Sequence, residues 1–298
     1  MPLDHRLQNL RAVVLLAGAV RVNQLRKATG RSALEMPVGG GRIVLDCWRE
    51  QLVATAERLG MRRLPVRVIV DRASAMKPGV SRHGPVEMSV ELDPSQLRGT
   101  GGLLSDLAKG YGDDDLILVP HASQLLFEPL AEMAGDLAQA GSDVGMVCSA
   151  DGTPNGLMLI RCGCLRDINP VGFVDLNEQA LPGIARDGDV RVVRYDRPTA
   201  RSLRTLSGYI QTLREYHHLQ VGTGRAAAAV PAPWEKTFGI VEAGTQVHET
   251  AIVHDSVVMA GARVQAHAVL VRCIVCPGAE VGRGESQIDR VVGGGLVS

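Results

Sequence analysis

Short apolar runs that are typical of buried strands alternate with amphipathic stretches from the start of the chain to about residue 220. Residues 13–18, 66–71 and 116–121 are such runs, and further strands are predicted at 144–147, 157–160 and 190–195. Helical spacing appears over 103–109 and 203–217, and also at Leu45, Trp48, Leu52, Ala56 and Leu59. This alternation predicts an α/β domain with a mostly parallel, Rossmann-like sheet that helices cover on both faces.

The ends of the first three strands are the first places to look for a ligand site. In open parallel sheets, ligands bind outside the carboxyl ends of the strands. Gly18, Asp71 and His121 end the three runs. We therefore expect these residues to lie along one edge of the sheet.

The last part of the chain has a different pattern. Residues 221–239 are rich in glycine, alanine and proline and are typical of a linker. Beyond them a period close to six residues appears, in which an aliphatic residue opens each unit and a small residue usually follows four positions later, as at Val241, Val247, Val253, Val258, Val264, Val275 and Val281. This is the hexapeptide pattern of a β-helix, and six residues on each of three faces give about two and a half coils for 240–285. The sequence thus predicts an α/β domain at 1–220, a linker at 221–239 and a β-helix at 240–298, which serves for oligomerisation or as a brace.

Composition narrows the function classes. The chain has 32 Lys plus Arg against 32 Asp plus Glu, so no global positive field favours a nucleic-acid partner. The apolar stretch 12–20 has only nine residues, which is too short to span a membrane. Six cysteines are too few for a disulfide scaffold and fit a reducing compartment. We therefore expect a cytoplasmic protein without nucleic-acid or membrane partners.

Several clusters allow more than one interpretation. The Cys162–Cys164 and Cys273–Cys276 pairs allow a zinc site, but their apolar surroundings favour small buried side chains. Three adjacent carboxylates at 113–115 precede a predicted strand and indicate a solvated turn at the amino end of the sheet more than a Mg²⁺ site. Histidines at 248, 254 and 267 allow acyl transfer, for which the predicted β-helix is short.

An α/β sheet followed by hexapeptide repeats resembles the sugar-1-phosphate nucleotidylyltransferases, in particular the mannose-1-phosphate guanylyltransferase type. Residues 16–38 match the ends and the length of the family's opening loop, L-A-G-G-x-G-T-R-L-x-P-L-T-x-x-x-P-K-P-L-x-P-V, although not its middle. Residues 98–103 (Arg-Gly-Thr-Gly-Gly-Leu) match its G-T-A-G-A segment, 119–122 stand where its N-G-D motif ends a strand, and 202–209 correspond to D-x-G-T-x-x-x-Y. The resemblance implies a nucleotidyltransferase-like sheet followed by a short left-handed β-helix.

The resemblance also implies a chemistry that this chain lacks the groups to perform. Members of the family let a sugar phosphate attack a nucleoside triphosphate, and Mg²⁺, Arg and Lys stabilise the charge on the phosphoryl oxygens. The family's Arg, Lys and two metal-binding Asp residues fall here on Asn23, Ala33, Ala122 and Ser202. None of the four is charged, so we expect no catalytic residues and no metal site of the family type, and no cofactor.

What remains is the side of the pocket that would hold a base. Between Ala122 and residue 156 the chain lacks the two strands and the E-K-P segment that contact the sugar phosphate in the family. The residues predicted to bind a nucleotide are Ala17, Gly18, Arg21, Asn23, Gly99, Thr100, Gly101 and His121. The glycines allow two interpretations, a close approach of the backbone to a base or simple tight turns between strand and helix.

Two further features of this region also allow more than one interpretation. Four positive charges follow the first strand, at Arg21, Arg26, Lys27 and Arg31, and indicate either an anion site or a solvated loop. His121 is a candidate phosphate contact or base, although the sequence reveals no partner that would orient it.

Two functions are consistent with this sequence. The first is a relative that binds a nucleotide or nucleotide sugar, has lost efficient transfer and acts as a regulatory or scaffold subunit, as a homo-oligomer or beside a paralogue that contacts its β-helix. The second is an active nucleoside triphosphate:sugar-1-phosphate nucleotidyltransferase with a rearranged, Mg²⁺-dependent site. Asp71, His121 or the carboxylates at 113–115 would then replace the missing groups.

Overall fold

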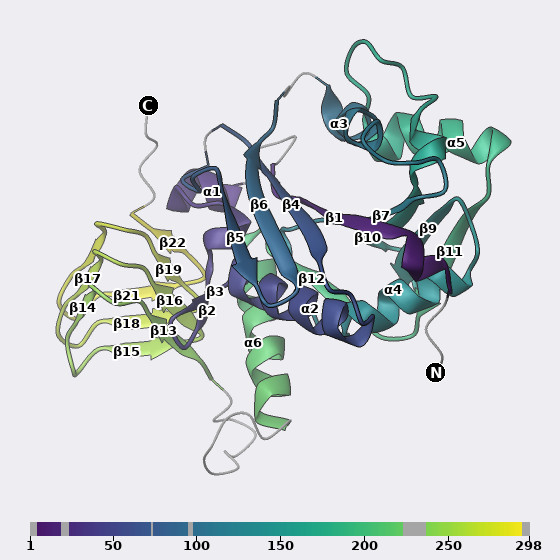
Figure 1. The fold of residues 1–298 in the computed structure, drawn as a ribbon. Coiled ribbons are helices and arrows are strands. Elements are labelled where there is room, and N and C mark those ends of the chain that lie inside the picture. Colours follow the sequence, from purple (N-terminus) through teal and green to yellow (C-terminus); the bar gives the residue numbers. More distant parts are fainter. Residues whose placement is uncertain (1–4, 19–23, 73, 95–97, 223–236, 294–298) are drawn as a thin grey trace. The chain divides into compact units, whose positions relative to one another are not determined.

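The computed structural model describes residues 5–18, 24–72, 74–94, 98–222 and 237–293 (Figure 1). The chain forms two compact units. The first comprises Met1–Arg21, Trp48–Ala122 and Leu126–Ala200, and the second Val22–Cys47, Ser123–Leu125 and Arg201–Ser298. Within the described ranges, no helix has both the length and the apolar character that crossing a membrane requires.

The first unit is built on an eight-stranded sheet with the order β11-β9-β10-β7-β1-β4-β6-β5. Its strands are β1 (Leu10–Leu16), β4 (Leu64–Val70), β5 (Gly79–His83), β6 (Val86–Leu92), β7 (Leu116–Pro120), β9 (Val144–Ser149), β10 (Pro154–Arg161) and β11 (Val190–Tyr195). The four consecutive strands β7, β1, β4 and β6 pair in parallel, as do β9 and β11. β10 is antiparallel to both of its neighbours, and β5 is antiparallel to β6. The predicted α/β class with a mostly parallel sheet is confirmed.

Helices cover both faces of this sheet. α3 (Gly99–Ala108) places Leu103 and Leu104 in one core cluster with Val14 and Val119, and α5 (Leu181–Asp187) contributes Leu181 to the same cluster. α2 (Val44–Arg58) and α4 (Leu130–Gln139) lie along the opposite side, as Figure 1 shows. These two helices are joined where the Gln51 side chain accepts a hydrogen bond from the backbone amide of Leu130 (3.0 Å).

The order of the strands creates a switch point beside β1. From β1 the chain continues through α2 to β4 and then to β6, on one side of β1. It then returns through α3 to β7, on the other side. Where the direction of winding reverses in this way, the carboxyl ends of the two adjacent strands leave room for a ligand. The carboxyl ends of β1 and β7 are therefore the place to examine.

The second unit combines the segment after β1 with the C-terminal part of the chain. Before the C-terminal strands it contains α1 (Gln24–Thr29), a 3₁₀ turn at Ala33–Glu35, the hairpin β2 (Pro37–Gly39) and β3 (Arg42–Ile43), and α6 (Leu206–Gly222). The short strands β8 (Gln124–Leu126) and β12 (Ala200–Ser202) pair where the two units join in sequence. Most of the predicted linker, residues 223–236, lies outside the described part of the chain, and the predicted domain boundaries stay predictions.

The C-terminal strands form three short parallel sheets, which fits the predicted β-helix. The sheets are β13-β16-β19-β22 (Gly239–Val241, Ser256–Val258, Ile274–Val275, Val291–Val292), β14-β17-β20 (Gln246–Val247, Arg263–Val264, Glu280–Val281) and β15-β18-β21 (Ile252–His254, Val269–Val271, Ser286–Ile288). The aliphatic side chains of Val258, Val264, Leu270 and others form one buried cluster inside. The repeat thus stacks its aliphatic residues as the sequence pattern predicts.

The coil is shorter than six residues on each of three faces. Gly239 pairs with Ser256 and Val257 with Ile274, so one coil takes 256 − 239 = 274 − 257 = 17 residues. The reason is a corner of a single residue between β15 and β16, at Asp255, which adopts a positive φ of 47°. The same corner recurs at Arg272 (52°) and Asp289 (53°). Residues 240–285 thus make 46/17, or about 2.7, coils, close to the predicted two and a half, and strand pairing continues beyond them to Val292.

Candidate ligand site at the carboxyl edge of the sheet

Ala17 and Gly18 form the end of β1 at the switch point. Both backbone amides donate to the carbonyl oxygen of Ile69, at 2.9 and 2.8 Å, so the chain leaves β1 held against β4. A Cβ placed on Gly18 would lie 3.4 Å from the backbone nitrogen of Asp71, which is close packing. Gly18 thus packs against the backbone that follows β4, and access of a flat ligand group to this turn stays a prediction.

His121 follows β7 at the other side of the switch point. It forms an isolated parallel bridge with Leu16, and its amide donates to the carbonyl of Gly156 (2.9 Å). Gly156 has a φ of +75°, and a Cβ there would lie 2.7 Å from Cδ2 of the His121 ring. The ring is therefore positioned by the backbone of β10. This contact is a positioning feature that the sequence did not reveal.

Two carboxylates lie on the same edge, one strand further along. Asp71 follows β4 and is 8% exposed, and Asp93 follows β6 and is half-buried. The Asp93 amide donates to the carbonyl of Val70 (2.7 Å), so the two carboxyl-terminal turns are adjacent. Across the described ranges, no three side chains of His, Cys, Asp or Glu come together as a metal site.

The start of α3 is occupied by a neighbouring loop. The amide of Gly101 donates to the carbonyl of Val174 (2.9 Å), and the Thr100 hydroxyl accepts a hydrogen bond from the amide of Leu176 (3.1 Å). A Cβ on Gly99, where φ is +69°, would lie 2.4 Å from the Val174 carbonyl oxygen. The glycines thus admit a backbone segment of the protein itself, which favours the tight-turn interpretation. A nucleotide contact by Gly99, Thr100 or Gly101 stays a prediction.

Three of the four positions at which the resemblance implies charged groups lie in the described part of the chain. Ala122 is 1% exposed, and its carbonyl accepts a hydrogen bond from Nε1 of Trp48 (3.2 Å). Ser202 is exposed, and its hydroxyl accepts a weak hydrogen bond from the Arg204 amide (3.4 Å). Ala33 begins a 3₁₀ turn. Asn23 and Arg21 lie outside the described residues.

The basic segment after β1 is partly engaged in structural contacts. Nη1 of Arg31 lies 2.7 Å from Oε1 of Glu242, and both side chains are largely buried. Arg26 is 9% exposed, whereas Lys27 is exposed. Glu242 also accepts a hydrogen bond from the amide of Ala260 (2.8 Å). Arg31 therefore anchors the β-helix and is neither a solvated nor an anion-seeking side chain.

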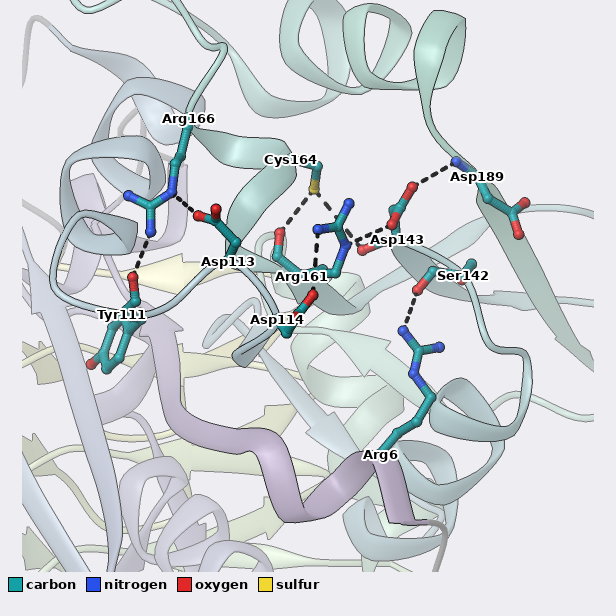
Figure 2. Close-up of polar contacts among 10 residues, drawn as sticks. All are labelled: Arg6, Tyr111, Asp113, Asp114, Ser142, Asp143, Arg161, Cys164, Arg166 and Asp189. Atoms are coloured by element: carbon teal, nitrogen blue, oxygen red, sulfur yellow. Dashed lines mark hydrogen bonds and ion pairs between the residues drawn. The ribbon is translucent and has the colours of Figure 1, made fainter.

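The carboxylates at 113–115 lie at the amino end of β7, away from the switch point. Asp113 pairs with Arg166, and Asp115 accepts a hydrogen bond from Nε of Arg11 (2.8 Å). Asp114 is 3.9 Å from Arg161. Figure 2 shows the Asp113 and Asp114 pairs side by side in one polar cluster. Each carboxylate thus faces a guanidinium, which confirms the expected turn.

The same cluster contains a second, half-buried polar network. Asp143 accepts hydrogen bonds from the backbone amide of Asp189 (3.0 Å) and from Nε of Arg161 (2.7 Å), and these contacts, in that order, lower the pKa of its carboxyl group (Figure 2). The Cys164 thiol donates to the carbonyl of Arg161 (2.9 Å), and burial raises its pKa to about 12. Such a thiol is inert at neutral pH.

The remaining cysteines confirm the structural interpretation. Cys162 and Cys273 are 0% exposed and Cys276 is 2% exposed. Burial raises the pKa of Cys162 and of Cys276 to about 11. These thiols pack as small apolar side chains inside their respective units. Among the histidines of the β-helix, Nδ1 of His248 lies 2.9 Å from the Thr250 hydroxyl, a local corner contact.

Comparisons with known proteins add little at the level of family. No family model and no curated protein matches the chain. A crystal structure of HddC from Yersinia pseudotuberculosis is similar to it, with a TM-score of 0.49 and 11% sequence identity, over 70% of this chain and 100% of that chain.

Proposed function

We propose that this protein binds a nucleotide or a nucleotide sugar at the carboxyl edge of its sheet and acts as a regulatory or scaffold subunit without efficient transfer activity. The proposal includes kinship with the sugar-1-phosphate nucleotidylyltransferases and a left-handed β-helix, both of which rest on the motifs of the sequence. The strand–helix order and the three stacked parallel sheets are consistent with that kinship.

The observation that carries the proposal is the convergence of predicted residues on the switch point. Ala17 and Gly18 follow β1, and His121 follows β7, the adjacent strand at which the winding reverses. Strand ends at such a point are the usual place for nucleotides in open parallel sheets. A glycine turn gives a flat base access to the backbone, and an imidazole supplies a donor for a phosphate oxygen.

The absence of charge at the family's metal positions supports the loss of efficient transfer. Ala122 is packed in the interior beside Trp48, so the position after β7 offers a methyl group where the family has a carboxylate. Phosphoryl transfer depends on cations that neutralise the developing charge, and removing one such contact costs on the order of 10³-fold in rate.

A second candidate function is supported by Asp71. This carboxylate is nearly buried beside Gly18, on the same edge as His121. In an active enzyme with a rearranged site, Asp71 would hold Mg²⁺ and His121 would contact the phosphates. The carboxylates at 113–115 no longer belong to this alternative, because they pair with arginines at the opposite end of β7.

Titration calorimetry separates the two candidates. The purified protein is titrated with the common nucleoside triphosphates and nucleotide sugars, with and without Mg²⁺, and pyrophosphate release is followed in parallel. We expect binding without turnover, weakened at least tenfold in His121→Ala but unchanged in His83→Ala, whose histidine lies on the edge strand β5. Mg²⁺-dependent binding with pyrophosphate release would support the alternative, and the absence of any binding would refute both.

We further propose that the β-helix joins copies of this chain through the sheet β15-β18-β21. The outward ladder of β13, β16 and β19 is covered within its own unit, with Ile240, Val257 and Ile274 at most 6% exposed. The face of β14, β17 and β20 is polar, with Arg263 and Glu280 outward. The third face instead exposes Ile252 (57%) and Ile288 (54%).

The register places Ile252 beside Val269 and Ile288 beside Val271, so these side chains form an apolar patch that runs diagonally across the face. An exposed apolar patch of this kind marks an interface. The partner that covers this face is a second copy of this chain, because the repeat is expected to serve for oligomerisation. Light scattering after size-exclusion chromatography should give an oligomer for the wild type and a monomer for the Ile252→Asp, Ile288→Asp double variant. A control substitution on the polar face, Gln246→Asp, should leave the oligomer intact. A monomeric wild type would contradict the proposal.

A further inference from the structure

His217, near the end of α6, is held between two other elements of the second unit. Its ring stacks on Phe238, immediately before β13, with centroids 5.5 Å apart and planes at 15°. On its other side is Gly39 at the end of β2, where φ is +97° and a Cβ would lie 2.9 Å from Cε1 of His217. Tyr216 meets the ring edge-on at 5.8 Å. The imidazole therefore fills the joint between α6, the β2–β3 hairpin and the first strand of the β-helix.

The polar contacts of this ring suit only its neutral form. The imidazole hydrogen-bonds the backbone of Val38, and a carbonyl oxygen there can only accept, so the ring donates one N–H. Nε2 is buried, and no residue of the described chain hydrogen-bonds it. In the neutral ring this nitrogen carries a lone pair, whose missing partner costs less than an unpaired charge would. Protonation would place a positive N–H at Nε2 against Gly39 and Phe238, without an acceptor.

The charged groups around the joint are already engaged with one another. On α6, Arg214 lies 3.2 Å from Asp255, whose other carboxylate oxygen accepts a hydrogen bond from the Phe238 amide (3.2 Å). The Tyr216 hydroxyl and the Cys47 thiol lie 3.6 Å apart, and Nη2 of Arg42 donates to the same sulfur at 3.6 Å.

The other titratable groups of these elements offer His217 no counter-ion. On α6, Glu215 is paired with Arg201 (2.9 Å), Tyr209 is fully buried and His218 is exposed. Glu242, just after β13, is paired with Arg31. Burial lowers the pKa of His217, while its hydrogen bond to Val38 opposes that shift only in part.

We propose that His217 is a pH-sensitive latch, by which we mean a contact whose strength depends on protonation. The neutral ring stabilises the packing of the β-helix against α6 and the β2–β3 hairpin, and protonation of the ring weakens the packing at this joint. The direction follows from linkage. A histidine whose pKa is lowered in the closed form binds its proton more readily in the open form. The joint is therefore tightest above the ordinary histidine pKa of about 6.5 and weakens as the pH falls below it. The latch is independent of the nucleotide site, so its test does not depend on that proposal.

The test compares the full-length wild type with His217→Phe, which keeps an aromatic ring in the stack but cannot be protonated. Thermal unfolding and hydrogen exchange of the amides in α6 and β13 are measured between pH 7.5 and 5.5. We expect the melting temperature of the wild type to fall, and its exchange to accelerate, more steeply than those of His217→Phe. His218→Phe is the matched control and should behave as the wild type does.

Nuclear magnetic resonance of the wild-type imidazoles provides a second, mutation-free measurement. The His217 ring should titrate below the ordinary histidine pKa of about 6.5. Equal pH dependence in the wild type and His217→Phe, or a His217 ring that titrates at or above 6.5, would overturn the proposal. If His217→Phe does not fold, the imidazole titration alone decides.

Discussion

Replacing Gly99 with alanine tests whether the glycine-rich start of α3 exists for packing or for a ligand. The substitution has two separate costs. The residue sits at φ +69°, where an L side chain costs about 1–2 kcal/mol. The new Cβ would also lie 2.4 Å from the Val174 carbonyl oxygen, and forcing an extra carbon into close-packed surroundings costs about 1–3 kcal/mol. The free energy of unfolding should therefore fall by about 2–5 kcal/mol.

Gly60 provides a matched control in the same unit. It has nearly the same φ, +64°, but no atom lies within 4 Å of a Cβ placed there. Gly60→Ala should therefore carry only the backbone cost of about 1–2 kcal/mol. Urea unfolding followed by circular dichroism gives both values, and their difference isolates the contact with Val174.

One result would refute this reasoning. If the two alanine variants lose the same free energy of unfolding, the Val174 backbone can move away from the new Cβ without an energetic cost. The contact with its carbonyl is then not the reason for a glycine at position 99. A Gly99→Ala variant that keeps control-level stability but no longer binds nucleotide would instead favour a ligand at this turn.

Three other predictions follow from polar and thiol side chains of the described structure. The carboxyl pKa of Asp143 is lowered in the folded state, so its stabilising effect is complete above the ordinary pKa of 3.8 and is lost below it; the stability difference between wild type and Asp143→Asn should shrink in urea titrations as the pH falls from 5 to 3. Trp48→Phe removes the N–H donor to the buried carbonyl of Ala122 and should lower the free energy of unfolding by about 1–3 kcal/mol, measured by urea unfolding. Cys162 and Cys276, whose pKa values burial raises to about 11, should not react with Ellman's reagent at pH 8 until the protein is unfolded; rapid labelling of the native protein would contradict their burial.

Local sequence patterns predicted much of the fold. The apolar runs at 13–18, 66–71 and 116–121 correspond to β1, β4 and β7, because buried parallel strands need continuous aliphatic side chains. The same pattern placed Gly18, Asp71 and His121 at strand ends, where the structure has them. The aliphatic repeat likewise led to the stacked C-terminal sheets, because each coil must present its apolar residue to the next. The hairpin of β5 and β6 went unpredicted, since exposed residues of β5 such as Val80 and Arg82 do not form an apolar run.

The candidate site was only partly accessible to sequence reasoning. The residues at the ends of β1 and β7 could be named, because strand order and polarity follow from local signals. The group that packs against Gly99 could not be named from the sequence, because Val174 is 75 positions away (174 − 99) and no local pattern records that contact. The ring of His121 is likewise fixed by Gly156, on a strand that pairs antiparallel with β7.

The sequence by itself determined the class of the sheet, the polar ends of its central strands and the stacking repeat, since these depend on the periodicity of side chains along a single segment. Only the tertiary structure decided which partners those side chains meet. It paired Arg31 with Glu242 and packed His217 between Gly39 and Phe238, and it shortened each coil to 17 residues through the single-residue corner at Asp255. The physical reason is that a contact between distant residues depends on the closure of the whole chain, and the short-range forces that shape each segment do not specify it.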